Sequence, residues 1–282
     1  MIKVVCWNID AQKRREVWDE LFGMDADVAL LQEVKSFPED IPPDVEMDSR
    51  PLREPWDVKD YDRWPTIIRL SRRVKVEWFQ RIRPYHTLKS DQIGVSGIGT
   101  LAAARVTSYE AEIPPFIVAS MYARWMFPNP STNTKWSVGF ADGSAHRIIS
   151  DLSAFIGSHD PSTHRILAAG DLDTVFGVTT DSPQDLPERN QSIFDRFQAL
   201  GFEFVGPQSP NGRMADTTPK YLSPDTKNVP TFALHKKAEN AVDQLDYVFA
   251  SRGFHESVQT CALNRIDEWG PSDHCRILIE VS

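Results

Sequence analysis

The apolar positions of this chain follow two different periods, which predict short strands and a few amphipathic helices. Residues 3–7 and 27–31 are nearly continuous apolar runs, as is typical of buried strands. Between them, residues 14–24 repeat large apolar side chains every three or four positions, as one face of a helix does. The chain therefore is expected to begin with a strand, a helix and a second strand.

The rest of the chain continues this alternation. Residues 36–62 are rich in Pro and Asp and predict a surface loop, whereas residues 66–106 alternate apolar with charged positions, as half-buried antiparallel strands do. Further strands are expected at 116–121, 165–169, 244–250 and 275–281, and helices at about 146–156 and 191–200. Many strands without regular βαβ alternation indicate an α+β fold with two packed sheets and helices outside. With no repeat or long linker, we expect a single domain over residues 1–282.

Composition and charge narrow the possible classes of protein and of site. Eight Trp, fifteen Phe and a hydrophobic fraction of 41% can fill a large core, and three Cys do not suggest a disulfide framework. No signal peptide and no apolar run of about 20 residues is evident, so we expect a cytoplasmic protein without a membrane span. The net charge of −9 gives no support for a basic face that grips long duplex DNA. It fits a carboxylate-rich site for a divalent cation. Oligomeric state is not indicated.

Polar or acidic residues occur where four of the predicted strands end. Such positions can converge at one rim of a sheet sandwich. Glu33 and Asp273 could supply carboxylates to Mg²⁺, with Asn8 as a neutral oxygen ligand or a donor to a neighbouring ligand. Asp171 is a candidate base for activating water, and His274, if protonated, could hydrogen-bond a phosphoryl group. Each of these residues alone is more often a cap or turn residue; their ordered set carries the argument.

That ordered set resembles the endonuclease/exonuclease/phosphatase superfamily. The resemblance extends over nearly the whole chain and rests on five segments: Trp7-Asn8-Ile9, Leu31-Gln32-Glu33-Val34, Gly170-Asp171-Leu172-Asp173, Gln244-Leu245-Asp246-Tyr247-Val248-Phe249 and Pro271-Ser272-Asp273-His274. It implies a four-layer αββα sandwich of two mainly antiparallel sheets flanked by helices. It also implies hydrolysis of phosphate esters with Mg²⁺, for which Mn²⁺ can substitute. The segment at 244–249 resembles the penultimate strand of the family.

The resemblance also implies a role for each residue. Glu33 would bind the metal, with Asn8 and Asp273 at or beside it, and Asp171 would orient or deprotonate the attacking water.

A second group of residues would act on the phosphate. Asp246 would hydrogen-bond His274 and favour its charged form. Asp243 is a rival for Asp246, but it precedes the strand and is better interpreted as a turn residue. Tyr122 ends a predicted strand, where nucleases of the family place a residue that contacts the phosphate. A packed aromatic with a satisfied hydroxyl is an equally good interpretation of Tyr122.

Asp173 departs from the family pattern, which usually has Asn at this position. A carboxylate only accepts hydrogen bonds and repels phosphate unless it is protonated or bound to metal. Asp173 could therefore help to hold a second cation, could be neutral beside Asp171, or could belong to an impaired or retuned site. We favour the metal contact.

The substrate is less clear than the reaction. Basic residues between 69 and 89 could track nucleic acid, but strand alternation favours a solvated sheet face for them. The aromatic loop at 124–130, with Trp136 beyond it, could stack a base, form a lid or touch a lipid surface. A nuclease or nucleotide phosphodiesterase is the first hypothesis. An enzyme acting on inositol phosphates or phospholipid head groups, and a catalytically weakened binding module, are the alternatives.

Overall fold

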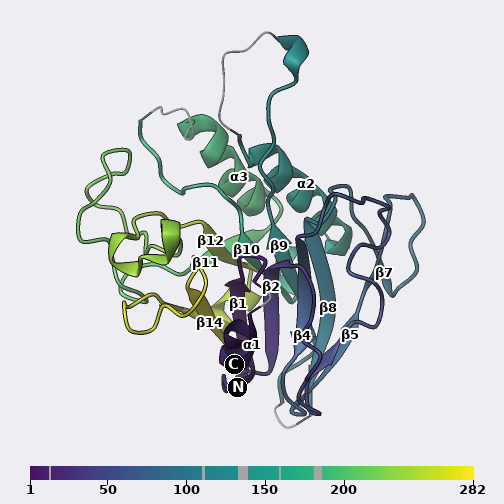
Figure 1. Ribbon diagram of the computed structural model, residues 1–282. Helices are drawn as coiled ribbons and strands as arrows, with labels where there is room; N and C mark the ends of the chain where they lie inside the picture. Colours follow the sequence, from purple (N-terminus) through teal and green to yellow (C-terminus); the bar gives the residue numbers. More distant parts are fainter. Residues whose placement is uncertain (13, 110–111, 133–138, 159, 181–185) are drawn as a thin grey trace.

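The computed structural model describes the chain except for residues 13, 110–111, 133–138, 159 and 181–185. Two six-stranded sheets pack face to face, with helices on their outer faces (Figure 1). The layers run from helix α1 through the two sheets to helices α2 and α3. The α+β, four-layer αββα architecture predicted from the sequence is therefore confirmed, although each sheet mixes parallel and antiparallel pairs.

The first sheet has both ends of the chain near its centre. Its strand order is β13-β14-β1-β2-β4-β3. Strand β1 pairs antiparallel with β14. It pairs parallel with β2, because helix α1 carries the chain back between these two strands. The strands are β1 (Ile2–Asn8), β2 (Val28–Val34), β3 (Glu46–Met47), β4 (Trp64–Arg69), β13 (Val258–Leu263) and β14 (Arg276–Val281).

The second sheet has the order β11-β12-β10-β9-β8-β5. Strands β9 and β10 run parallel, and β12 runs antiparallel to β10, with Asp171 opposite both Tyr122 and Asp246. Its strands are β5 (Val74–Trp78), β8 (Leu101–Ser108), β9 (Phe116–Tyr122), β10 (Ile166–Asp171), β11 (Phe202–Gly206) and β12 (Asp246–Ser251). A separate pair is formed by β6 (Gln80–Ile82) and β7 (Gln92–Gly94).

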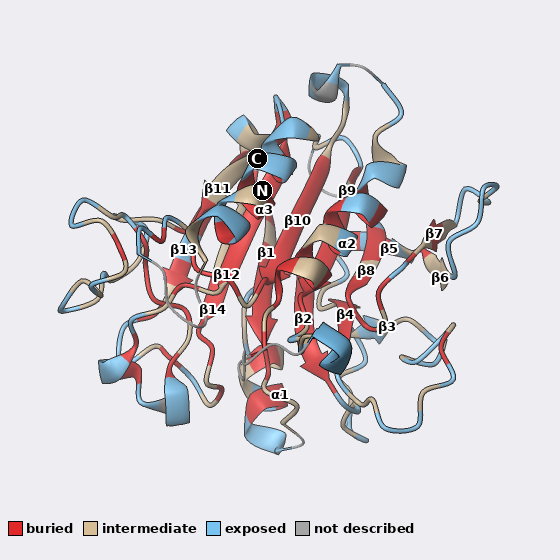
Figure 2. Cartoon of the chain, turned by 90° about the horizontal axis from the view of Figure 1, so that it is seen from above, coloured by how far each residue is buried: buried red, intermediate tan, exposed pale blue. Residues whose placement is uncertain are grey.

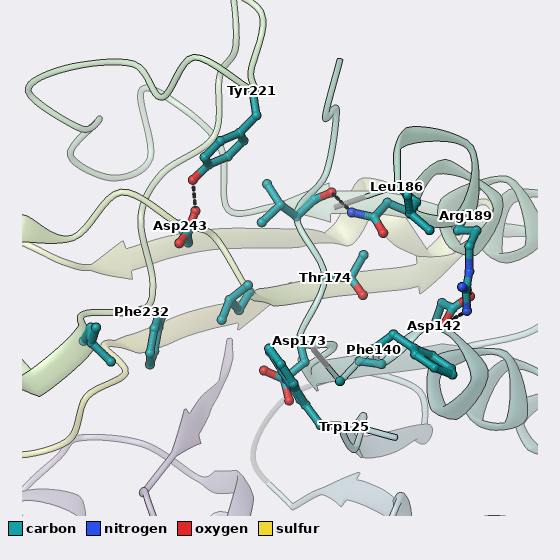
Figure 3. A pocket seen from close by; sticks show the side chains of 16 residues that line it. Trp125, Phe140, Asp142, Asp173, Thr174, Leu186, Arg189, Tyr221, Phe232 and Asp243 are labelled. Carbon is teal, nitrogen blue, oxygen red and sulfur yellow. Dashed lines mark hydrogen bonds and ion pairs between the residues drawn. The ribbon is translucent and has the colours of Figure 1, made fainter. Parts of the chain in front are cut away.

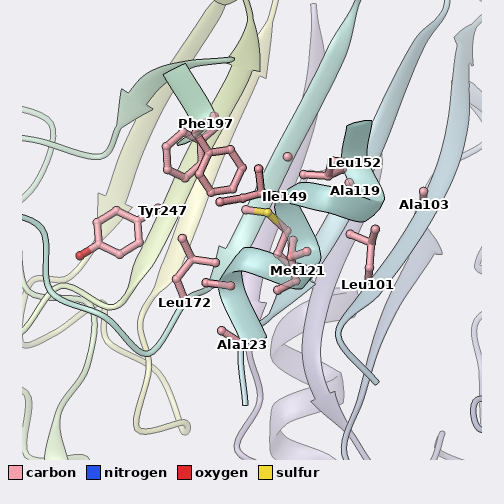
Figure 4. Packing of buried hydrophobic residues seen from close by; sticks show 14 of the residues in the cluster. Leu101, Ala103, Ala119, Met121, Ala123, Ile149, Leu152, Leu172, Phe197 and Tyr247 are labelled. Atoms are coloured by element: carbon pink, nitrogen blue, oxygen red, sulfur yellow. The ribbon is translucent and has the colours of Figure 1, made fainter. Parts of the chain in front are cut away.

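Each layer boundary is filled by its own apolar cluster. Helix α1 (Arg15–Phe22) buries Trp18 and Leu21 against the outer face of the first sheet. Helices α2 (Asp142–Leu152) and α3 (Pro187–Ala199) cover the second sheet, where Ile149 and Phe197 pack on its strands (Figure 4). The strands are buried throughout the middle of the molecule, and exposed residues gather on loops and outer helix faces (Figure 2).

The remaining helices are short 3-10 turns. They cover Pro130–Thr132, Ser153–Phe155, Pro161–Thr163, Leu234–Lys236, Ala238–Asn240 and Phe254–Ser257. None of the helices in the described ranges is long and apolar enough to cross a bilayer. The cytoplasmic location and the single-domain organisation stay predictions. The three cysteines are free, as the composition suggested.

Several element boundaries differ from the sequence prediction. Helix α2 begins at Asp142 rather than near residue 146, and its last turn tightens to a 3-10 turn. Strands β11 and β13 were not predicted. Because β13 follows β12, the strand that begins at Asp246 is the third from the end, not the penultimate one. The loop at 36–62 contains the two-residue strand β3.

Candidate active site

The ends of five strands meet at one rim of the sandwich. Asn8, Tyr122 and Asp171 are the last residues of β1, β9 and β10, and Asp246 is the first residue of the antiparallel strand β12. The hydroxyl of Ser272 donates to the Asn8 carbonyl at 2.7 Å, which ties the turn before β14 to the same rim. This turn carries Asp273 and His274, so the structure brings all the segments of the predicted site together.

A continuous hydrogen-bonded chain links four of the predicted residues. The Asn8 side-chain amide donates to Asp171 Oδ2 at 2.8 Å and to Glu33 Oε1 at 3.3 Å. The Tyr122 hydroxyl donates to the same Glu33 oxygen at 2.9 Å. Burial, and then the Glu33 charge, raise the pKa of Tyr122, so its hydroxyl stays a neutral donor. The Tyr122 hydroxyl therefore has a hydrogen-bond partner, and this partner, Glu33, is one of the acidic residues of the predicted site.

Glu33 reaches this chain through an irregularity in β2. Its φ of 57° lies in the left-handed region, and the pairing of β2 with β4 shifts register between Leu31 and Val34. A bulge of this kind re-aims one side chain at a backbone cost on the order of 1 kcal/mol. Arg63, just before β4, forms an ion pair with the second Glu33 oxygen. This partner was not predictable from the sequence, since Arg63 lies 30 residues away at the end of a loop.

His274 is held between two carboxylates. Its Nδ1 is 2.7 Å from Asp246 Oδ2, and its Nε2 is 3.8 Å from Asp171 Oδ2. Burial opposes the charged imidazole, but the charge of Asp246, followed by that of Asp171, raises the pKa of His274 well above its ordinary value. His274 is therefore an imidazolium at neutral pH. The Asp246 backbone N–H donates to the Thr231 hydroxyl at 3.0 Å, which fixes the start of β12.

Asp171 and Asp173 form a second acidic pair. The Asp173 N–H donates to Asp171 Oδ1 at 2.9 Å. Burial, and then the Asp173 charge, raise the pKa of Asp171. Burial also raises the pKa of Asp173, to about 7, although a hydrogen bond from Trp125 favours its charged form. Asp173 is therefore divided between its neutral and charged forms near neutral pH, and Trp125 joins the aromatic loop to the site.

Trp125 and Arg63 were missed as site residues by reasoning from the sequence. The only signal for Trp125 was the aromatic loop after Tyr122. Phe127 of this loop is exposed, at 68%, and Trp136 lies outside the described residues. Asp243 forms an isolated β-bridge with Phe232, and its carboxylate accepts a hydrogen bond from Tyr221.

The donor atoms at the rim suit a divalent cation. Asp171, Asp246 and His274 each have a potential ligand atom within 4.8 Å of the others, but the imidazolium of His274 would have to lose a proton to bind an ion. Asp246 Oδ1 is buried and has no hydrogen-bond partner among the described residues. This group differs from the set of Glu33, Asn8 and Asp273 that the sequence suggested, although both sets are parts of the same rim. Carboxylate and amide oxygens are the ligands that hard cations prefer.

Comparisons with solved structures find the same fold over essentially the whole chain. The AP endonuclease of Leishmania major is 13% identical, with a TM-score of 0.61, over 100% of this chain and 88% of that one. The catalytic domain of APE2 from Xenopus laevis is 16% identical, with a TM-score of 0.61, over 99% and 91%. The 3'-5' exonuclease of Neisseria meningitidis is 12% identical, with a TM-score of 0.59, over 100% of both chains.

Sequence comparisons give no further assignment. No family model matches the chain, and no curated protein matches it. The likeness to these nucleases is therefore a likeness of fold, and the chemistry must be argued from the rim itself.

Proposed function

From its endonuclease/exonuclease/phosphatase fold and the acidic rim, we propose that this protein hydrolyses phosphoester bonds with the help of a divalent cation. The substrate class we propose is a phosphodiester of nucleic acid or of a nucleotide. A single observation carries the proposal. The hydrogen-bonded chain from Tyr122 through Glu33 and Asn8 to Asp171 adjoins the His274–Asp246 pair, so acidic oxygens and a buried imidazolium face one another.

The His274–Asp246 pair supplies positive charge for the phosphate. Asp246 accepts from Nδ1, which directs the other N–H of the imidazolium, on Nε2, into the rim. A donor fixed in this way stabilises the charge that develops on phosphoryl oxygens, at little cost in reorganisation. His274 therefore binds and polarises the phosphoryl group.

Asp171 supplies the base. One of its oxygens accepts from Asn8 and the other from the Asp173 N–H, so the carboxylate is held in one orientation. Its raised pKa makes it a stronger proton acceptor than an ordinary carboxylate once it is ionised. Asp171 orients the attacking water and takes its proton.

Glu33, Asn8 and Asp273 would hold the cation, with Mg²⁺ as the expected ion and Mn²⁺ as a substitute. When bound, this cation supplies a Lewis acid to the phosphoryl oxygens. We place it on the Glu33 side because the imidazolium of His274 lies between Asp171 and Asp246 and would repel a cation there. Asp173 lies between the two sides, where it can contact the cation in its charged form.

The alternatives receive less support. Inositol phosphates carry further negative charge, and the cavity beside the rim is lined by three carboxylates, Asp142, Asp173 and Asp243. A binding module without activity would not need a complete set of base, imidazolium and metal ligands.

The histidine tests the mechanism. We expect His274→Ala to lower kcat on a chromogenic diester such as bis-p-nitrophenyl phosphate by about 10²-fold or more, since it removes a fixed donor to the transition state. The exposed His86 provides the matched control His86→Ala, which should keep full activity. Circular dichroism checks that both variants are folded. Near-normal turnover of His274→Ala would refute the mechanism.

The cation requirement and the substrate class need a panel assay. Single- and double-stranded DNA, abasic DNA, RNA, nucleotide esters and inositol phosphates are each incubated with Mg²⁺ or Mn²⁺. We expect EDTA to abolish every turnover and either ion to restore it. Activity that survives EDTA would contradict the proposal, and a protein that binds Mn²⁺ without cleaving any substrate would be the binding module.

A further inference from the structure

A cavity of about 500 Å³ opens directly beside the proposed phosphate site (Figure 3). Asp173 and Phe232 lie at its inner end, and the Phe232 ring centroid is 5.0 Å from that of the His274 imidazole. Arg189 and Asp142 lie at its far end, on helices α3 and α2. Its volume falls within the range of about 300–1,000 Å³ that is usual for small-molecule sites. A group attached to a phosphate at His274 would therefore extend into this cavity.

Four aromatic side chains are among the residues that line the cavity. Trp125, Phe140, Tyr221 and Phe232 come from four separate segments of the chain and all face it (Figure 3). Trp125 is held by its hydrogen bond to Asp173, and Tyr221 by its bond to Asp243. Rings fixed in this way offer flat surfaces on which a planar ring can stack, worth about 1–3 kcal/mol per nucleobase in single-strand binding proteins.

The charges of the cavity disfavour another phosphate. Among the described residues that line it, three carboxylates (Asp142, Asp173 and Asp243) face one cation, Arg189. Arg189 is already engaged, because its guanidinium donates to both Asp142 oxygens at 2.6 and 2.7 Å and lies 4.6 Å from the Phe140 ring centroid. The cavity is therefore an acceptor-rich space, which suits a neutral ring that carries N–H donors.

We propose that this cavity receives the base of a nucleotide whose phosphate lies at His274 and Asp171, and that it prefers bases with an exocyclic amine. Adenine and cytosine present such an amine, to which a carboxylate accepts well, whereas uracil and thymine present a carbonyl oxygen at the equivalent position. The inference rests on the proposed function, because it takes the phosphate to lie at the rim. It adds a substrate preference: a base inside a cavity is unstacked, so the substrate is a free nucleotide ester, an unpaired strand segment or a nucleotide flipped out of a duplex.

Equilibrium binding tests this inference without turnover. Isothermal titration calorimetry with Mg²⁺ present compares the adenosine, cytidine and uridine 5'- and 3'-monophosphates, which contain no diester bond, with ribose 5-phosphate. For the phosphate position that binds better, we expect AMP to bind at least about 10-fold more tightly than ribose 5-phosphate, since one stacked base contributes on this order. We also expect AMP and CMP to bind more tightly than UMP.

Two variants separate stacking from hydrogen bonding. Tyr221→Ala should reduce the advantage of AMP over ribose 5-phosphate by about 5-fold or more, because it removes one stacking wall. Asp243→Asn keeps the shape but replaces an acceptor-only group, so it should reduce the preference for AMP over UMP. The control Tyr109→Ala removes a tyrosine that is 65% exposed and does not line the cavity; it should leave both ratios as they are.

The outcomes distinguish the cavity from the catalytic proposal. If ribose 5-phosphate binds as tightly as AMP, or if Tyr221→Ala leaves the ratio unchanged, the base subsite is refuted even when diesters are hydrolysed. If AMP binds with the expected preference while no diester is hydrolysed, the subsite stands and the proposed hydrolase activity fails.

Discussion

Asp173 is the residue at which this site departs most from the pattern of the superfamily that the sequence resembles, and its surroundings explain how the fold tolerates a carboxylate there. Its φ of 47° is a conformation that Asp adopts more readily than most residues, and Trp125 donates a hydrogen bond to it. Neither this backbone conformation nor the hydrogen bond was visible in the sequence, because Trp125 is 48 positions away and reaches Asp173 through a loop. The sequence allowed three interpretations of Asp173, and its raised pKa favours the one in which its carboxyl group is partly neutral. The ionised fraction can still contact a metal.

The pKa of Asp173 gives a prediction for stability. The pKa of Asp173 is raised in the folded state, so ionisation of its carboxyl group opposes folding. The protonated carboxyl group contributes its full stability below the ordinary pKa near 3.8. This contribution is lost as pH rises through about 7. Asp173→Asn removes this loss. We expect it to be close to wild type at pH 4.5 and more stable by about 1–2 kcal/mol at pH 8, in EDTA. Urea unfolding at the two pH values measures this, and equal differences at both would contradict it.

Arg63 gives a prediction for metal affinity. Its guanidinium forms an ion pair with Glu33, the residue we expect to bind the cation. Because Arg63 competes for this carboxylate, Arg63→Gln should tighten Mn²⁺ binding by about 10-fold. Paramagnetic resonance of free Mn²⁺ measures the affinity directly. Arg72→Gln, which removes a surface ion pair with Asp44, is the control, and an unchanged Kd for Arg63→Gln would show that the pair does not compete.

At the scale of elements, the close approach of β9 and β10 sets the position of Asp171. A Cβ on Gly170 would overlap the carbonyl oxygen of Met121, which is backbone and cannot move aside without separating the strands. Position 170 therefore requires a glycine because the neighbouring strand leaves no space for a side chain, and not because the backbone turns there. The sequence showed a Gly before Asp171 but not the strand that excludes a side chain there.

Gly170→Ala should therefore destabilise the protein by about 3 kcal/mol or more, since the clash is with main chain. Gly157→Ala is the matched control, because nothing lies within 4 Å of the position of its Cβ. Thermal unfolding of the two variants makes the comparison. A Gly170→Ala protein as stable as wild type would mean that β9 and β10 can separate without cost.

The elements themselves were mostly predictable, with instructive exceptions. Strands such as β1 and β10 are continuous apolar runs, and α3 repeats its apolar residues at helical spacing, so each was visible in the pattern. Strand β13 alternates buried with exposed positions at the edge of the first sheet, and its pattern is too short and polar to stand out. The bulge at Glu33 was not predictable, because register is a property of the paired strand β4.

At the scale of the whole molecule, charge argues against a protein that binds long duplexes. Four of the seven Arg and Lys residues between 69 and 89 form ion pairs with acids. These pairs join Arg69 to Glu46, Arg72 to Asp44, Arg73 to Asp25 and Asp27, and Lys75 to Glu77. With a net charge of −9, little of the binding free energy can come from counterion release.

We therefore expect a shallow salt dependence. Proteins that neutralise 6–10 phosphates lose about 10³–10⁵ in affinity between 50 and 200 mM salt. The affinity of this protein for an unpaired oligonucleotide should fall by less than about 10-fold over this range, which corresponds to at most two phosphate contacts. Fluorescence anisotropy in EDTA measures the slope. A steep slope would indicate a basic surface that these ion pairs do not account for.

The tie between the first and last strands has a consequence for synthesis. Trp7 donates its indole N–H to the His274 carbonyl at 2.9 Å, and Ile2 pairs with Val281, so the chain ends lie side by side (Figure 1). Asn8 and Glu33 precede His274 by more than 200 residues, so a growing chain carries one part of the rim long before the other. The imidazolium joins the acidic residues only when β14 pairs with β1, and a chain that has not formed this pairing lacks the complete site.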